Sequence, residues 1–564
     1  MFNRILMRQW LAWTFAVCLI CPLAAPAMGQ ELSERQVHDE PRLYPGFQGY
    51  ARPITCRGES VQAWFDQGIQ LLYGYNHDEA IRSFEKAAEL DPSCAMAWWG
   101  SAYARGLHIN NPEMSEEQSQ QAYAAAQKGL AALDDESEVE RALVWAVATR
   151  YAVPVPQDRR HLDEAYAEAM RQVWHRFPDD PDVGALYAES LMNLQPWDLW
   201  THVGQPKGRA MEIVAVLDRT LEKHPDHPGA NHFYIHAIEA SPWPELGVPA
   251  AERLSTLIPG SGHLVHMPSH IFVRVGRYAE AAELNARAIA ADEAYFAMAP
   301  PPDFYSLYFM HNVHFLAYAA MMEGRYEVAY SAARKIEQQI PPAFLQNYVT
   351  MADGFMPTTW HVMIRFGKWE QILNEPEPDA GRLVSRAAWH YARTVALSNL
   401  NRLAEAETEL RQMDQLIEML TDEWKVGNNQ ATDVMAIARL MAGGELAFHR
   451  GESELAFDQL RRAVALEEQL TYDEPPGWMQ PVRHALGALL LAADRAQEAE
   501  SVYRDDLGRH PHNAWSLLGL QQALVKQRRV DEAEAMAEQV RQAWERADVQ
   551  PVASCFCHPD AKQK

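Results

Sequence analysis

Three stretches between Asn231 and Ala329 concentrate histidines that could bind a metal ion. They read NHFYIHAIEAS, HLVHMPSHIFVRVGRYAEA and FMHNVHFLAYAAMMEGRYEVA. Within each stretch the histidines recur three, four or seven residues apart, which places them on one face if the stretch is helical. The candidate ligands are His232, His236, His263, His266, His270, His311 and His314, and Glu239 lies on the same face as the first two.

Several imidazoles with one carboxylate are typical of a transition-metal site. Neutral imidazole is the commonest metal ligand, and two histidines one helical turn apart can share an ion. The order of affinities favours copper and zinc, and nearby methionines such as Met267 and Met310 shift the preference slightly towards copper. We therefore predict a copper or zinc site, in either a metal-dependent enzyme or a metal-handling protein. In a metal-centred enzyme, Glu239 would be a ligand or the general base.

Other interpretations of these residues remain open. A single histidine on an apolar helix face is more often a packed core residue than a ligand. The stretches could also line a metal-free groove for a peptide or protein partner, or a closed, tryptophan-rich cavity for a small molecule. The sequence has no HExxH, GxSxG or P-loop motif and no dinucleotide fingerprint, so an enzyme built here would depend on its metal.

The elements that position these residues are predicted to be paired helices of a repeat. Residues 61–94 place Gly68, Ala80, Phe84 and Pro92 at the offsets of such a pair. Small residues let two helices approach, an aromatic ring fills the space between them, and proline ends the second helix. This pattern resembles the tetratricopeptide repeat (TPR) family, and similar units follow along most of the chain. The resemblance implies an all-α fold, a right-handed superhelical solenoid of TPR-like helix pairs.

The same anchors suggest how the chain is divided. The expected parts are a signal peptide (1–27), a loop segment (28–60), N-terminal TPR units (61–134), divergent helical repeats (135–227), central TPR units (228–376), C-terminal TPR units (377–546) and a tail (547–564). TPR identity by itself implies partner binding and says nothing about catalysis.

The repeat register relates the histidines to one surface. In TPR proteins the first helix of each pair lines a concave groove. With units that start near residues 228, 262, 310 and 353, the seven histidines and Glu239 fall at groove positions, and so does His361. The resemblance therefore implies that four consecutive units direct these side chains into one concavity.

Two local features bear on that concavity. The run HLVHMPSHIF resembles one carried by a group of exported bacterial TPR proteins. Its Pro268 lies inside an expected helix between two candidate ligands, where it should interrupt the helix and redirect His270. Pro-Trp pairs at Trp197 and Trp243 mark loops that are placed to close over the groove.

The first residues are typical of an export signal. Arg4 and Arg8 precede an apolar run too short to span a bilayer comfortably, and Ala25-Pro26-Ala27 offers a cleavage site. We expect an exported protein, periplasmic if the source is a Gram-negative bacterium, with no membrane insertion after cleavage.

Composition limits the partners. The 564 residues carry a formal charge of −26, with 48% hydrophobic residues and 17 tryptophans. Such a chain is too apolar to be disordered and too long for one compact core. Its acidity disfavours nucleic acid as a partner and favours cations.

Four cysteines follow the signal. Export would permit a disulfide, and Cys56–Cys94 is the candidate pair. Cys555 and Cys557, in a Cys-Phe-Cys-His end, could bind a thiophilic metal, pair with each other or stay free.

Overall fold

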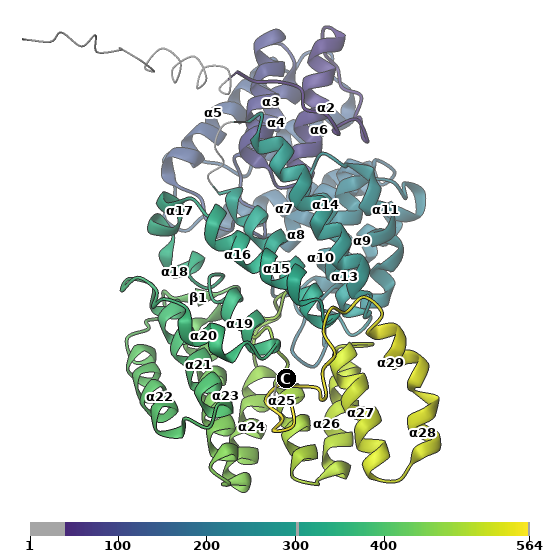
Figure 1. Cartoon of the computed structure of the whole chain (residues 1–564). Coiled ribbons are helices and arrows are strands. Elements are labelled where there is room, and N and C mark those ends of the chain that lie inside the picture. The colour runs from purple at the N-terminus through teal and green to yellow at the C-terminus, as the bar shows by residue number, and fades with distance from the viewer. Residues whose placement is uncertain (1–39, 300–303, 562–564) are drawn as a thin grey trace, which may run out of the picture. The chain divides into compact units, whose positions relative to one another are not determined.

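The computed structural model describes residues 40–299 and 304–561, and we consider the compact unit Pro41–Lys564 by itself. The predicted signal peptide lies outside the described residues. Within them the fold is all-α, a right-handed solenoid of TPR-like helix pairs, and consecutive helices pack against each other along the chain (Figure 1). None of the described helices is long and apolar enough to cross a membrane.

The first part of the solenoid contains α2 (Glu59–Tyr73), α3 (His77–Leu90), α4 (Ala95–Ala104), α5 (Glu116–Ala132), α6 (Glu138–Ala148), α7 (Arg160–Arg176), α8 (Pro181–Met192) and α9 (Ala210–Lys223). The central part contains α10 (Pro228–Ile238), the 3-10 helix η1 (Pro244–Gly247), α11 (Val248–Leu257), α12 (Gly262–His266), α13 (Pro268–Arg274), α14 (Tyr278–Phe296), α15 (Ser306–Met322), α16 (Tyr326–Gln339), α17 (Pro342–Asn347), α18 (Val349–Ala352), α19 (Thr358–Arg365) and α20 (Trp369–Asn374). The last part contains α21 (Leu383–Asn399), α22 (Leu403–Ile417), the hairpin β1 (Lys425–Val426) and β2 (Asn429–Gln430), α23 (Ala431–His449), α24 (Ser453–Glu467), α25 (Val482–Ala492), α26 (Ala496–Arg509), α27 (Ala514–Lys526), α28 (Val530–Ala535) and α29 (Ala537–Ala543).

Small residues and rings join the helices of a pair, as the sequence predicts. The Phe84 ring of α3 lies so close to Gly68 of α2 and Gly100 of α4 that a Cβ at either glycine would come within 2.7 Å of it. The Tyr503 ring of α26 packs in the same way against Gly487 and Gly519. A larger residue at these glycines would separate the helices, because packed interiors leave no room for an extra carbon.

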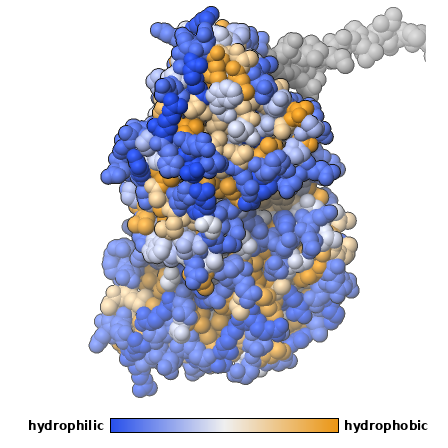
Figure 2. Space-filling view, turned by 180° about the vertical axis from the view of Figure 1, so that it is seen from behind, coloured by the Kyte–Doolittle hydropathy of each residue, from blue (hydrophilic) through white to orange (hydrophobic). Residues whose placement is uncertain are grey.

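The two helices of a unit differ in burial. First helices such as α10 and α25 are buried around nearly their whole circumference, whereas second helices such as α9 and α16 bury one face and leave the other in water. The surface in Figure 2 is accordingly mostly hydrophilic, with apolar residues in small groups. The surface formed by the first helices is therefore covered within the fold.

C-terminal parts of the chain cover the surface formed by the first helices. The indole of Trp515 on α27 donates a hydrogen bond to the carbonyl of Met321 at 2.8 Å, and the guanidinium of Arg365 lies 2.7 Å from His484 of α25. C-terminal units therefore pack against α15 and α19. This brings the loop between α24 and α25 next to the central histidines.

The cysteines differ in part from expectation. Cys56 and Cys94 are both free thiols, so this candidate pair is not bonded. Cys94 is buried at the start of α4, whereas the thiol of Cys56 contacts the carbonyl of Gly58 in the preceding loop. Cys555 and Cys557 are bonded to each other, one of the alternatives for the C-terminal end.

A buried carboxyl on α23 predicts a pH-dependent stability. Burial raises the pKa of Glu445 to about 8, with Asn399 as its hydrogen-bond donor. Because the pKa of Glu445 is higher in the folded than in the unfolded state, ionisation of this carboxyl costs no stability below about pH 4.5. Between there and about pH 8 the free energy of unfolding falls by ~1.4 kcal/mol per pH unit. We expect Glu445→Gln, which stays neutral, to be more stabilising at pH 8 than at pH 5 by up to ~4 kcal/mol. Urea unfolding at both values tests this. Exposed Glu534→Gln is the control, and an effect independent of pH would contradict the prediction.

Candidate metal centre

The predicted ligands lie on four helices of the central part that converge. His232 and His236 lie on α10, His263 and His266 on α12, His270 on α13, and His311 and His314 on α15. Six of these side chains are at most 8% exposed, and His311 is half-buried. An open peptide groove would leave such residues in water, so their burial favours a closed site.

The first trio consists of His232, His236 and His263, whose candidate ligand atoms lie within 4.8 Å of one another. The Nδ1–H of His232 donates to the carbonyl of Tyr73 at 2.7 Å, which leaves a lone pair on its Nε2. That Nε2 lies 3.2 Å from the Nε2 of His263. The Nε2 of His236 is buried without a hydrogen-bond partner. The three rings therefore direct candidate ligand nitrogens toward one another, and that of His236 has no partner.

The second trio consists of His266, His270 and His311, also within 4.8 Å. The Nδ1–H of His266 donates to Oδ1 of Asn285 at 2.7 Å. The orientation of that amide is fixed because its nitrogen donates to Ser269 and to the Ala281 carbonyl. The Nε2 of His270 lies 2.9 Å from that of His266 and 3.5 Å from that of His311.

Glu239 connects the two trios. Its Oε1 accepts a hydrogen bond from Nδ1 of His236 at 2.8 Å, and its Oε2 lies 2.6 Å from Nδ1 of His270. Burial alone would raise the pKa of Glu239, but the charge of His270 and the hydrogen bonds of both histidines outweigh it and lower the pKa to about 2. The residue is thus a carboxylate behind the ring nitrogens, a position that orients metal-bound histidines. It does not lie at a ligand position.

The tautomers follow from these contacts. A carboxylate cannot donate, so His236 and His270 carry their protons on Nδ1, as do His232 and His266. The Nε2 atoms of His266 and His270 lie 2.9 Å apart, a hydrogen-bond distance at which a proton on one Nε2 is shared with the lone pair of the other. Two nitrogens bound tetrahedrally at about 2.0–2.1 Å from one ion stand roughly 3.3 Å apart. A cation between them would replace that proton.

The protonation state also suits a metal. Burial, reinforced by neighbouring histidines, lowers the pKa of His232, His263, His266 and His311 well below the ordinary value. Burial also lowers the pKa of His236. These imidazoles are neutral at pH 7, and only neutral imidazole binds a metal ion.

The predicted interruption at Pro268 is confirmed. Helix α12 ends at His266 and α13 begins at Pro268. Proline is favoured at the first helical turn because its missing N–H is not needed there. The break leaves His266 and His270 on two short helices, with their Nε2 atoms facing each other.

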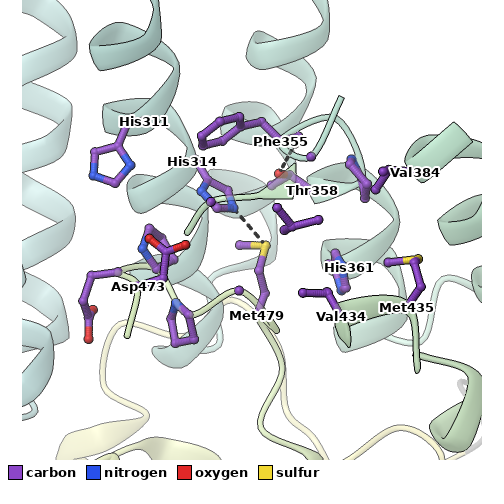
Figure 3. Close-up of a pocket in the computed structure, with 18 residues that line it drawn as sticks. His311, His314, Phe355, Thr358, His361, Val384, Val434, Met435, Asp473 and Met479 are labelled. Carbon is purple, nitrogen blue, oxygen red and sulfur yellow. Dashed lines mark hydrogen bonds between the residues drawn. The ribbon is translucent and has the colours of Figure 1, made fainter. Parts of the chain in front are cut away.

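His314 belongs to neither trio and lies in a neighbouring pocket with His311. Its Nε2 is 3.2 Å from the sulfur of Met479, and burial lowers its pKa to about 3 (Figure 3). His361, on the other side of Met479 in Figure 3, lines the same pocket. The structure therefore brings together six of the seven predicted ligands and places His314 beside them.

Sequence reasoning missed the loop between α24 and α25. Its Tyr472 lines a small pocket with His236 and Glu239, and its Asp473 lines the pocket of His311 and His314. Burial raises the pKa of Asp473 to about 7. The segment TYDEPPGWM has no helical period and follows the histidines by more than a hundred residues, so nothing local could have placed it.

Comparisons with known proteins concern the repeats. Residues 490–546 match a family model described as tetratricopeptide repeat. No curated protein matches the chain. Solved structures with similar folds include a human IFIT1 dimer with m7Gppp-AAAA (12% identity, TM-score 0.30, covering 86% of this chain and 91% of that chain). Another is yeast Tom70 (12% identity, TM-score 0.27, covering 86% of this chain and 92% of that chain). A third is the APC/C hetero-tetramer Cut9-Hcn1 (11% identity, TM-score 0.28, covering 92% of this chain and 82% of that chain).

Proposed function

We propose that this protein is a metal-dependent enzyme in which each histidine trio binds one transition-metal ion. The observation that carries the proposal is two groups of three histidines whose candidate ligand atoms lie within 4.8 Å of one another, with the Nε2 atoms of His266 and His270 2.9 Å apart. In the first trio the Nε2 atoms of His232 and His263 lie 3.2 Å apart. Glu239, shared between the trios, makes the two ions one centre.

The donor set favours copper, with zinc as the second choice. All six candidate ligand atoms are imidazole nitrogens, which suit copper, zinc, iron and nickel, whereas Mg²⁺, Ca²⁺ and Mn²⁺ prefer oxygen. Among divalent ions, copper binds such sites most tightly. The export signal predicted for the N-terminus leads us to propose a compartment outside the cytoplasm.

An enzymatic role is favoured by the number of ligands. Structural zinc sites have four protein ligands, whereas catalytic sites keep three and leave a position for water or substrate. Each trio supplies three. Copper at such an open position could react with O2, and zinc could lower the pKa of a bound water.

Metal content tests the proposal. Untagged protein purified from its own compartment should contain about two copper or zinc ions per chain by elemental mass spectrometry. Metal that binds only the folded state stabilises it, by about 2.7 kcal/mol per site at a hundredfold excess over Kd. Chelation should therefore lower the melting temperature and metal should restore it. Absence of metal, with a melting temperature that copper and zinc do not change, would reject the proposal. It would leave the metal-free scaffold that binds a peptide or protein partner, for which affinity capture is the assay.

A further inference from the structure

A cleft opens beside the metal centre. Two loops form its walls: residues 193–209, between α8 and α9, and residues 468–481, between α24 and α25. Its cavity of about 630 Å³ is lined by Trp197, Trp200 and Tyr472. Sites for small molecules usually measure about 300–1,000 Å³. The same three residues line a smaller pocket of about 20 Å³ together with His236 and Glu239.

The aromatic wall is held in place next to the first trio. The Trp197 ring meets the His236 ring edge-on, with their centroids 5.3 Å apart. Trp197 has a φ of 58°, a conformation that bulky residues rarely adopt. The indole N–H of Trp200 donates to the Ala237 carbonyl at 2.8 Å, which fixes that ring. Rigid aromatic faces of this kind bind flat rings.

The opposite wall offers an unused acceptor. Glu474 lines the cleft with Tyr472 and is 6% exposed, and its Oε2 has no hydrogen-bond partner. A buried oxygen without a donor destabilises the fold. Such an atom requires an explanation, and a ligand that donates a hydrogen bond would supply one. Arg274 does not fill this role, because its guanidinium lies over the Tyr472 ring, 5.5 Å from the centroid.

We infer that this cleft binds the substrate of the metal centre, and that the substrate is a small aromatic molecule with a hydroxyl group, of the phenol class. Its ring lies between Trp197 and Tyr472, and its hydroxyl donates to Glu474. The ring then ends beside His236, next to the first ion. The inference rests on the proposed function, because it assigns a substrate to that centre.

The test uses three probes on full-length protein with and without metal: 4-methylphenol, 4-methylanisole, which lacks the donor, and 4-methylcyclohexanol, which lacks the ring. Calorimetry should show that the phenol binds at least tenfold more tightly than either analogue, because one analogue lacks the hydrogen-bond donor for Glu474 and the other lacks the aromatic ring. Trp197→Ala should weaken phenol binding at least tenfold. Glu474→Ala should abolish the preference for phenol over anisole. Trp145→Ala on α6, an exposed tryptophan outside the cleft, is the matched control.

Metal content and circular dichroism of the same samples separate the outcomes. A Trp197→Phe variant that keeps phenol binding excludes misfolding as the cause of the alanine result. If both cleft variants keep two ions and bind the phenol as before, the inference is overturned and the metal centre stands. Phenol binding with the expected preferences in a protein without metal would uphold the ligand site but overturn its assignment to a metal centre. Equal binding of all three probes, or none, would also overturn the inference.

Discussion

Glu239→Gln is expected to release one of the two metal ions while the fold is kept. The carboxylate faces Nδ1 of His236 in one trio and of His270 in the other. A glutamine has one acceptor oxygen, so its NH2 group must face one of these nitrogens. That imidazole would move its proton to Nε2 and could no longer bind a metal. Loss of such an outer carboxylate typically weakens metal binding ~10–100-fold. Competition with a chelator of known affinity measures this for each ion.

Glu222→Gln on α9 is the matched control, because it makes the same change at an exposed position. It should keep two ions at unchanged affinity. Glu239→Ala should weaken both sites, since neither Nδ1–H would then have an acceptor. If Glu239→Gln binds both ions as tightly as the parent protein, the carboxylate does not orient the ligands.

The fold was predictable because residue types recur at fixed short spacings along the chain, and these spacings determine the helix pairs. Phe84 and Tyr503 sit between glycines at repeat offsets that can be read directly from the chain, and helical spacing collects histidines on one face. Pro268 was informative for the same reason, since its effect on a helix is confined to one turn. These features need no knowledge of distant contacts.

The division into two trios was not predictable in this way. His263 and His266 are neighbours on α12, yet one belongs to each trio. Glu239 could be placed with His236 by spacing, but its second contact, with His270, depends on how α10 packs against α13. His314 shares a helix with His311, and it meets Met479 because the C-terminal units pack against α15. Each outcome depends on contacts between segments far apart in sequence.

His263→Ala and His311→Ala are each expected to remove one ion and leave the other. Structural zinc is bound with ~10–16 kcal/mol by four ligands, or roughly 3–4 kcal/mol per ligand, so losing one of three should weaken that site ~10²–10³-fold. The remaining trio keeps all three ring nitrogens. Elemental analysis after dialysis should give about one ion per chain for each variant and none for the double variant.

His314→Ala tests whether His314 on α15 is a metal ligand or lies outside both trios. His314 lies one helical turn beyond His311, and its Nε2 is 3.2 Å from the Met479 sulfur, so its removal should leave both ions bound. Loss of an ion in this variant would mean that His314 is a ligand, as the sequence alone predicts. Loss of both ions in either His263→Ala or His311→Ala would show that the six histidines hold their metal as a single unit. One ion in each would establish two sites that fill independently, because the trios share only Glu239, which is intact in both variants.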